Sequence, residues 1–251
     1  MYLPSITTKP RAPAALRTGR YTGGMEIAGV RAEFLDVNCY AVAAEHPEGQ
    51  ARECLLVDAG FDCAPRMKTL LDELGWTPVA VLLTHGHPDH VLGLPRLREV
   101  FPGLQAHLAA PDVYRLADPA GTLSPELGQM LGGMIGDWTA PEVVETADGA
   151  AWQAAGLAIE ATYAPGHTEG STLWRVRDTS GAAEDLEVPE VLFTGDVLFA
   201  GSIGRTDLPG GDDQAMRTSL RMFASMPDTP ILPGHGPGST IAHELRTNPF
   251  L

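Results

Sequence analysis

The sequence has 251 residues, of which 44% are hydrophobic and 20% are charged, a composition typical of globular proteins that excludes disordered, collagen-like and fibrous classes. Its 32 acidic residues outnumber 17 basic ones and give a net charge of −15, which would repel the phosphate backbone of a nucleic acid. No apolar run approaches the ~20 residues of a membrane-spanning helix, and the N-terminus has no signal-peptide core. We therefore expect a cytoplasmic protein without nucleic-acid or membrane partners.

Residues 1–25 differ in composition from the rest of the chain. They contain four basic residues and three prolines, and the first acidic residue is Glu26. This composition predicts a loosely ordered, flexible tail, although it also suits an organellar transit peptide. No Pro/Ser-rich or charged linker and no internal repeat interrupts residues 26–251, which we expect to form a single domain.

Turn signals separate short apolar runs in the first part of the chain. These runs predict strands at residues 25–35, 39–44 and 53–58, with a hairpin-like turn at residues 46–49. The period then becomes helical and Gly75 follows as a stop, which predicts an amphipathic helix over residues 64–74 with an apolar stripe of Met67, Leu70, Leu71 and Leu74. The continuous apolar run at residues 79–83 predicts a strand that is buried on both faces.

The same scheme continues to the end of the chain. Pro88 suits the first turn of a helix that runs toward Val100, which Pro95 must kink or divide. Residues 111–141 have weaker periodicity and are either a helical insertion that covers a site or a surface excursion. The sequence also predicts a helix over residues 213–225 and strands at residues 104–108, 157–163, 172–176, 190–194 and 230–232. Two strand-rich halves with helices predict an α/β sandwich of face-to-face sheets.

An unusual density of ligand-type side chains follows the buried strand. His85, His87, Asp89 and His90 place three imidazoles and one carboxylate within six residues at a strand-to-helix junction. Alternating positions on a turn can direct two ring nitrogens at one point, whereas Asp89 and His90 project toward a neighbouring point. Imidazole and carboxylate groups are ligands of zinc, iron and manganese.

Three further segments have the same local character, because each places a His or Asp beside glycine at the end of an apolar run. The residues are His167, Asp196 and His235. Glycine lets the backbone fold tightly at these positions and bring a ligand into a shared cleft. The remaining histidines, His46, His107 and His243, have no such context and are interpreted as ordinary structural residues.

Taken together, these segments are similar to those of metallo-β-lactamase-fold hydrolases, and specifically of the compact glyoxalase II-like branch. The matching motifs occur in family order: Asn38-Cys39-Tyr40, Val57-Asp58-Ala59-Gly60, His85-Gly86-His87-Pro88-Asp89-His90, His167, Asp196 and His235. The segments at residues 195–199, 201–212 and 248–251 are especially typical of that branch. The resemblance covers about residue 26 to the C-terminus and implies a four-layer αββα sandwich.

The resemblance also implies a site with two divalent metal ions, with zinc expected and iron or manganese compatible with the same ligands. His85, His87 and His167 would bind the first ion, Asp89, His90 and His235 the second, and Asp196 would bridge both. Asp89 and Asp58 are expected to be catalytic residues. Asp58 would orient a ligand histidine, and the alternative is that its carboxylate only closes the turn into Ala59 and Gly60.

The activity that the resemblance implies is hydrolysis of a thioester, such as an S-2-hydroxyacyl-glutathione or a related thiol adduct. Two ions can share a hydroxide at neutral pH and polarise the attacked carbonyl, so no side-chain nucleophile is required. This agrees with the cysteines: Cys39, Cys54 and Cys63 form neither a C-x-x-C pair nor an even set, and no motif pairs Cys39 or Cys54 with a base. We expect three reduced thiols in a reducing compartment.

Two departures from glyoxalase II concern recognition of the thiol. Full-length enzymes continue into a helical domain that contacts glutathione, whereas this sequence ends at Leu251. Arg205 occupies the position of a lysine that lies near the glutathione carboxylate in those enzymes, so we predict that it binds substrate. The alternative is an ion pair between Arg205 and Asp207.

The second candidate function is a persulfide dioxygenase, in which two histidines and an aspartate bind a single iron. That branch is similar at residues 204–207, but residues 208–211 are closer to the hydrolases. A β-lactamase is disfavoured because His90 replaces the arginine usual in the commonest of those enzymes, and a nuclease by the net charge of −15. A non-catalytic module would be expected to have lost a metal ligand, and this sequence retains them all.

Overall fold

The computed structural model describes residues 15–16, 25–45, 52–136, 138–179 and 190–251. Most of the predicted tail and the predicted turn at residues 46–49 therefore lie outside the described residues. Of the tail, Ala15–Leu16 forms the short strand β1, which pairs antiparallel with residues 29 and 30. None of the helices in the described ranges is long and apolar enough to cross a bilayer.

The first sheet combines an antiparallel and a parallel part. Strands β1 to β4 pair antiparallel in sequence order, and β4 to β7 pair parallel. After β1, its strands are β2 (Glu26–Arg31), β3 (Asn38–Ala43), β4 (Arg52–Val57), β5 (Trp76–Leu82), β6 (Gln105–Ala109) and β7 (Val144–Thr146). Helix α1 (Cys63–Leu74) connects β4 to β5, and helices α2 (Pro88–Val91) and α3 (Leu94–Val100) connect β5 to β6. The parallel strands thus have helical crossovers, as parallel pairs require.

The second sheet has the order β15-β14-β11-β10-β9-β8, in which only β11 and β14 pair parallel. Its strands are β8 (Ala151–Ala154), β9 (Leu157–Tyr163), β10 (Thr172–Asp178), β11 (Glu190–Gly195), β14 (Pro230–Pro233) and β15 (Ser239–Thr240). Between β11 and β14 lie the hairpin of β12 (Leu198–Phe199) and β13 (Ser202–Ile203), then helix α5 (Asp213–Met222) and a short 3-10 turn, Phe223–Ser225. Helix α6 (Ile241–Thr247) ends the fold.

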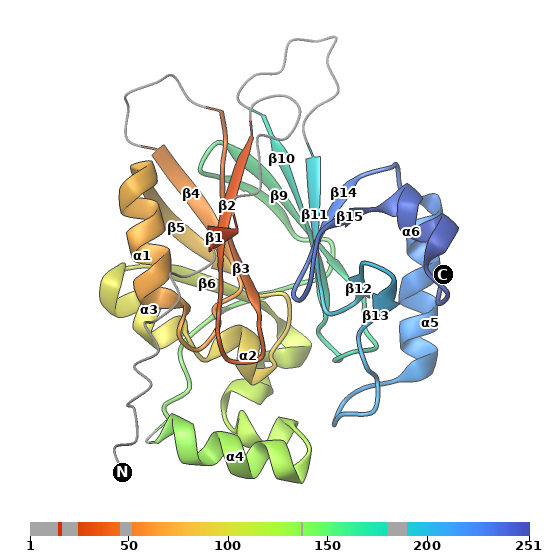
Figure 1. Ribbon diagram of the computed structural model, residues 1–251, viewed down its shortest axis with the longest axis horizontal. Coiled ribbons are helices and arrows are strands. Elements are labelled where there is room, and N and C mark those ends of the chain that lie inside the picture. Colours follow the sequence, from red (N-terminus) through yellow and green to blue (C-terminus); the bar gives the residue numbers. More distant parts are fainter. Residues whose placement is uncertain (1–14, 17–24, 46–51, 137, 180–189) are drawn as a thin grey trace, which may run out of the picture.

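Four layers result from three apolar interfaces (Figure 1). Between the sheets, Tyr40, Leu55 and Leu82 of the first pack with Trp174 and Phe193 of the second. On the outer faces, α1 and α3 cover the first sheet, and α5 and α6 cover the second. The predicted α/β fold, a four-layer αββα sandwich, is confirmed.

Strand β5 and helix α1 illustrate how the pattern produces these layers. Val81 packs toward α1, whereas Ala80 and Leu82 pack into the interface between the sheets, so β5 is buried on both faces. On α1 the buried side chains include Met67, Leu70 and Leu71. Leu74 does not complete the predicted stripe: it is 38% exposed, because it lies in the last turn, where the chain leaves the sheet surface.

The predicted helix from Pro88 to Val100 is divided, but not at Pro95. The break falls at Leu92 and Gly93, and Pro95 lies in the first turn of α3, where a missing N–H is tolerated. A Cβ atom on Gly93 would lie 2.0 Å from the carbonyl oxygen of Gly60. The close approach of these two backbones therefore determines where the helix ends.

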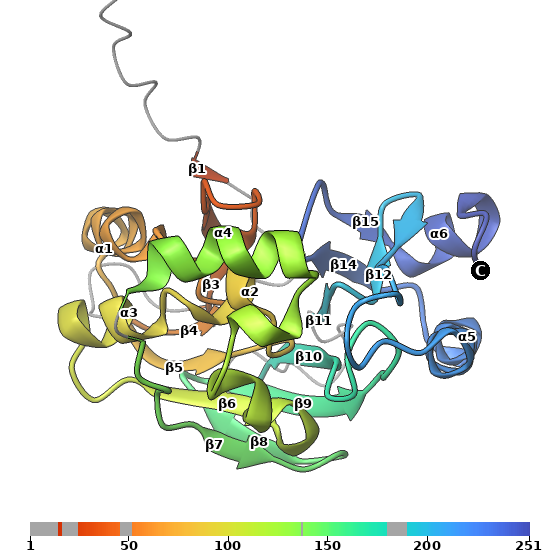
Figure 2. The same cartoon turned by 90° about the horizontal axis from the view of Figure 1, so that it is seen from below.

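The segment at residues 111–141 is a helical insertion. It contains two 3-10 turns, η1 (Ala110–Leu116) and η2 (Ala120–Thr122), and helix α4 (Pro125–Ile135). Figures 1 and 2 place α4 beyond α2 at one end of the molecule, where Leu131 belongs to an apolar cluster with Leu92 and Leu208. Because Asp112 and Arg115 of η1 are completely buried, the segment is not a mere surface excursion.

The sequence did not predict the short strands β7, β8, β12, β13 and β15 or helix α6. Each strand has two to four residues, too few for a hydrophobic period to be recognised. The strands β7, β8 and β15 each pair with a longer neighbouring strand, whereas β12 and β13 pair with each other in a separate hairpin.

Candidate metal centre

The ligand-type side chains gather where several strands end. Asp58 follows β4, His85 and His87 follow β5, Asp196 follows β11 and His235 follows β14. The two sheets meet at this edge, where the backbone N–H of Thr172 donates to the carbonyl of Thr84 at 2.8 Å. The carboxyl ends of strands are the usual location of sites in open α/β sheets.

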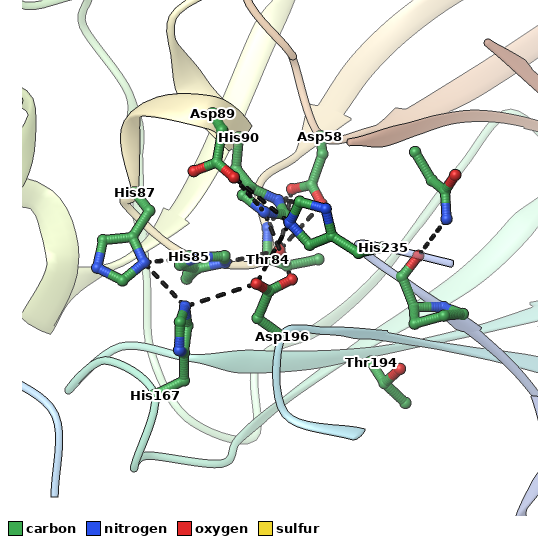
Figure 3. Close-up of polar contacts among 12 residues, drawn as sticks. Asp58, Thr84, His85, His87, Asp89, His90, His167, Thr194, Asp196 and His235 are labelled. Atoms are coloured by element: carbon green, nitrogen blue, oxygen red, sulfur yellow. Dashed lines mark hydrogen bonds and ion pairs between the residues drawn. The ribbon is translucent and has the colours of Figure 1, made fainter. Parts of the chain in front are cut away.

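His85, His87 and His167 form the first cluster (Figure 3). His87 Nδ1 lies 3.1 Å from His85 Nε2 and 2.8 Å from His167 Nε2. All three rings are buried, although His167 is 80 residues from His87 in sequence. Three ring nitrogens therefore face one point.

Asp89, His90 and His235 form the second cluster. Asp89 Oδ2 lies 3.6 Å from His90 Nε2 and 3.4 Å from His235 Nε2. Both Asp89 and His90 come from α2, a helix of four residues, so consecutive side chains contribute to the same cluster.

Asp196 lies between the two clusters (Figure 3). Its Oδ1 is 3.4 Å from His90 Nε2, and its Oδ2 is 3.4 Å from His235 Nε2 and 3.7 Å from His167 Nε2. One carboxylate is thus within reach of donors from both clusters. The structure brings together all seven side chains that the sequence singled out as ligands.

The spacing of the ligand atoms within the clusters suits bound metal ions better than it suits hydrogen bonds among the side chains. Ligand nitrogens about 2.0–2.1 Å from a tetrahedral zinc ion lie about 3.3 Å apart, close to the spacing within the first cluster. His87 Nδ1 cannot make good hydrogen bonds with two imidazoles that both present lone pairs. His90 Nε2 and Asp196 Oδ1 are buried and have no hydrogen-bond partner in the described part of the chain. Atoms in this state require an additional partner, and a cation suits them.

Asp58 and Thr84 determine which nitrogen of two histidines carries the proton. His90 Nδ1 lies 2.8 Å from Asp58 Oδ2 and donates to it, so the neutral ring, the form that binds a metal, has its lone pair on Nε2. The Thr84 hydroxyl lies 3.0 Å from both Asp58 oxygens and 3.1 Å from His85 Nδ1. Because the hydroxyl proton goes to the carboxylate, the hydroxyl accepts from His85 Nδ1, and His85 also presents Nε2 to the first cluster.

Asp58 is held in an uncommon conformation. Its φ is 60°, in the left-handed region that Asp tolerates better than most residues. Its side chain is 1% exposed and also accepts from the backbone N–H of Thr84 at 2.8 Å. A carboxylate that only closed the turn would not need these partners, so the geometry favours the orienting role over the turn-closing alternative.

His167 is oriented by the main chain. Its Nδ1 donates to the carbonyl of Arg205 at 2.7 Å, which directs Nε2 toward the first cluster and Asp196. His87 is the exception, because its Nε2 is buried without a partner among the described residues while Nδ1 faces the cluster.

The electrostatic field differs between the two clusters. Burial and then neighbouring imidazoles lower the pKa of His85 and His87 well below its usual value, so these rings stay neutral. Burial alone would lower the pKa of His90 and His235, but carboxylates raise it to about 9 for His90 and about 11 for His235. Despite burial, His90 and His235 hold the pKa of Asp196 below its usual range. The second cluster is therefore a region of negative potential that favours added positive charge.

The motif Asn38-Cys39-Tyr40 positions His235, a role that the sequence did not reveal. The Asn38 side chain donates to the carbonyls of Pro233 and Gly236 at 3.0 and 2.9 Å, and the Tyr40 hydroxyl donates to Pro233 at 2.8 Å.

Thr84 is a second residue to which the sequence assigned no role. Its position directly before the first ligand histidine was the available signal.

Arg205 lies beside the centre through its main chain, whereas its side chain pairs with Asp207. Its guanidinium forms two hydrogen bonds with Asp207, at 2.6 and 2.7 Å, so the predicted alternative of an ion pair is present. Both residues line a cavity of about 600 Å³ together with Gly204 and Arg217. The main chain of Arg205 thus contacts His167, while its guanidinium is paired with Asp207 and the residue lines this cavity.

The cysteines do not form a nucleophilic site. All three are free and buried. Contact with Cys63 and burial raise the pKa of Cys39, and burial also raises that of Cys54. A thiol with a raised pKa is a poor nucleophile at neutral pH.

Known proteins are similar to this sequence over most of its length. The sequence model of the Metallo-beta-lactamase superfamily matches residues 32–235. The chain belongs to the metallo-beta-lactamase superfamily. Hydroxyacylglutathione hydrolase GloC of Haemophilus influenzae is 33% identical over 202 residues, which cover 80% of this chain and 88% of that protein.

Two solved structures of this superfamily are also similar. TTHA1623, in a di-iron-bound form, is 33% identical with a TM-score of 0.69, covering 89% of this chain and 99% of that one. The BLEG-1 B3 metallo-beta-lactamase is 30% identical with a TM-score of 0.72, and the match covers 90% of this chain and 99% of that one. The chain is accordingly a metal-binding hydrolase of the metallo-beta-lactamase fold.

Proposed function

We propose that this protein hydrolyses a thioester of a 2-hydroxy acid, such as an S-2-hydroxyacyl-glutathione or a related thiol adduct. The observation that carries the proposal is the shared carboxylate: Asp196 lies between two complete ligand clusters. We assign His85, His87 and His167 to one divalent ion and Asp89, His90 and His235 to a second, with zinc as the expected metal. No described cysteine competes as a nucleophile.

Two divalent ions bound here would lower the pKa of a water molecule to about 7 and polarise the substrate carbonyl. The protein's own residues supply orientation and proton transfer. Asp58 and Thr84 keep the proton of His90 and His85 on Nδ1, away from the cluster. The water oxygen bonds to the carbonyl carbon, the C–S bond breaks, and the products are a carboxylic acid and a thiol.

We assign the proton acceptor of this reaction to Asp89. Its carboxylate is 11% exposed and belongs to the second cluster alone, whereas Asp196 lies within reach of both clusters. Asp89 can therefore accept a proton from the attacking water and return it to the departing thiolate without disturbing the first cluster. Asp58 does not reach the reacting atoms, because its carboxylate is occupied by Thr84 and His90.

The cavity beside Arg205 is the proposed site of the thiol carrier. Arg205 and Arg217 both line it, and two guanidinium groups suit the carboxylates of a peptide-like thiol. Gly204 separates this cavity from the centre, since a Cβ atom there would lie 3.2 Å from His167 Nδ1. A thiol carrier bound in this cavity would therefore lie next to the loop that holds His167.

The similarity to GloC supports this substrate class, because that relative is named a hydroxyacylglutathione hydrolase. The free, buried cysteines fit a reducing cytoplasmic compartment. TTHA1623 is described in a di-iron-bound form. The metal that this protein binds therefore has to be identified by measurement.

The test begins with elemental analysis of protein purified without added metal. Thiol release is then measured from a 2-hydroxyacyl-glutathione and a 2-hydroxyacyl ester of another thiol. We expect two ions per chain, thiol release that requires them, and loss of both in Asp196→Asn. The matched control is Asp178→Asn: this buried carboxylate accepts from Glu45 N at 2.7 Å, and it lies about 20 Å from the centre along β10.

Two outcomes would overturn the proposal. One iron per chain together with oxygen uptake on a persulfide would favour the single-iron dioxygenase. Ring opening of a β-lactam without thiol release would instead favour the activity for which BLEG-1 is named.

A further inference from the structure

Two buried charged residues of the insertion, Asp112 and Arg115, lie directly behind the first cluster. Both are completely buried, and Arg115 Nε donates to Asp112 Oδ1 at 3.2 Å. Such burial of charge is costly unless the groups are paired and hydrogen-bonded. Their partners therefore indicate what the pair does.

Asp112 binds the two loops that carry the first cluster. Its Oδ2 accepts from the backbone N–H of Gly86 at 2.7 Å and from the Thr168 hydroxyl at 2.8 Å. Its Oδ1 accepts from the backbone N–H of Gly170 at 2.7 Å. Gly86 lies between His85 and His87, and Thr168 directly follows His167. One carboxylate thus joins loops that are 80 residues apart at their histidines.

The glycines of these loops allow the close approach. A Cβ atom on Gly86 would lie 2.9 Å from the carbonyl oxygen of Asp112, and one on Gly170 would lie 2.7 Å from its Cγ. Any larger residue at either position would move the loop away from the carboxylate. The His-Gly-His spacing and the glycine after His167 therefore have a common cause.

Arg115 extends the same connection to a third segment. Its Nη2 donates to the carbonyl of Pro209 at 3.0 Å and to the Glu169 carboxylate. Pro209 belongs to the loop whose Arg205 carbonyl accepts from His167 Nδ1. The pair thus contacts the residues that follow His167 and the loop whose carbonyl orients its ring.

We propose that Asp112, oriented by Arg115, is a positioning residue that sets the spacing of the first cluster. His85 and His87 keep their distance from His167 because both loops donate to the same carboxylate. Asp58 acts differently, through the ring of His90 and the hydroxyl of Thr84. The inference rests on the metal centre proposed above but not on any substrate.

The test is metal binding by Asp112→Asn. An Asn side chain must present its NH₂ group to at least one of the loop donors, which separates the loops. Removal of such outer partners typically weakens metal binding about 10–100-fold. We expect a loss of this size in the dissociation constant of one ion, measured by competition with a chromophoric chelator, while the other constant changes less than threefold.

Cobalt-substituted protein identifies which ion is affected. The hyperfine-shifted imidazole N–H signals of His85 and His167 should broaden or move in Asp112→Asn, and that of His90 should not. Thr168→Val removes one hydroxyl donor to Asp112 and should give a smaller loss at the same ion. If Asp112→Asn does not fold, Thr168→Val tests the same proposal.

Asp178→Asn is the matched control, since it removes a buried carboxylate that accepts from the backbone far from the centre. A purely structural role for Asp112 predicts that both variants lower thermal stability and leave both metal constants unchanged. That result, or an equal loss at both ions, would overturn the inference. Because every readout is metal binding, failure to hydrolyse a thioester would leave the inference intact.

Discussion

Asp58→Asn should weaken binding of the ion in the second cluster. Asp58 is 1% exposed and accepts from His90 Nδ1 at 2.8 Å. An Asn side chain can accept from Thr84 through its oxygen, but its NH₂ group then faces His90 Nδ1. His90 would have to accept there and carry its proton on Nε2, the atom that faces Asp89 and Asp196.

Two independent estimates give the same size for this effect. A hydrogen bond to a charged group contributes about 1.5–3 kcal/mol. Loss of an outer partner of a ligand typically costs about 10–100-fold in metal affinity, which corresponds to about 1.4–2.8 kcal/mol. We therefore expect the second-cluster dissociation constant to rise at least tenfold.

The assay is a zinc titration against a chromophoric chelator, with urea unfolding of the metal-free protein measured in parallel. Asp178→Asn controls for the loss of a buried carboxylate. Thr84→Val keeps the shape of the side chain but removes the hydroxyl between Asp58 and His85, so it should affect the first cluster instead. Wild-type zinc binding by Asp58→Asn would refute the role assigned to Asp58 and leave only its part in the turn.

Further predictions concern packing, recognition and the thiols. Gly93→Ala should destabilise the protein by about 1–3 kcal/mol or more in urea unfolding, because the new Cβ atom would lie 2.0 Å from a backbone oxygen. Gly132→Ala should stabilise the protein by about 0.5–1 kcal/mol, because this position on α4 faces open space. Arg205→Ala should raise KM for the thioester with kcat and melting temperature unchanged, and Asp207→Ala should not raise KM; equal KM values for both variants would contradict substrate binding by Arg205. No cysteine should react with a thiol reagent at pH 8 until denaturant is added, and rapid labelling of the folded protein would contradict the buried placement.

The sequence predicted most of the fold because its longer elements have a clear period. Strand β9 has the predicted bounds, Leu157–Tyr163, and α1 differs from the prediction by one residue. The failures have a physical pattern. The helix break at Gly93 depends on a backbone contact with Gly60, 33 residues away in sequence, and no local period contains that contact.

The candidate site divides in the same way. The side chains of both clusters were identifiable because four of them lie within six residues after a buried strand and the other three lie beside glycines at strand ends. The groups that orient them were harder to identify. The hydrogen-bond partners of Thr84 lie 26 positions and 1 position away in the sequence. Those of Asp112 lie 26, 56 and 58 positions away. Only the three-dimensional structure brings such partners together.

The two positioning carboxylates come from different parts of the first sheet, and this has a consequence for metal loading. Asp58 follows β4 and contacts a ring of the second cluster directly, whereas Asp112 follows β6 and accepts from two backbone N–H groups and the Thr168 hydroxyl in the loops around the first cluster. A ring contact determines where the proton lies on one ligand, but a backbone contact determines the distance between ligands. Because the Asp58 carboxylate helps to raise the pKa of His90 to about 9, its substitution should lower that pKa and shift the pH dependence of metal binding to lower pH. Substitution of Asp112 should weaken metal binding at every pH. Zinc titrations of the two variants at several pH values would separate these effects, and pH profiles of the same shape for both variants would refute this division of roles.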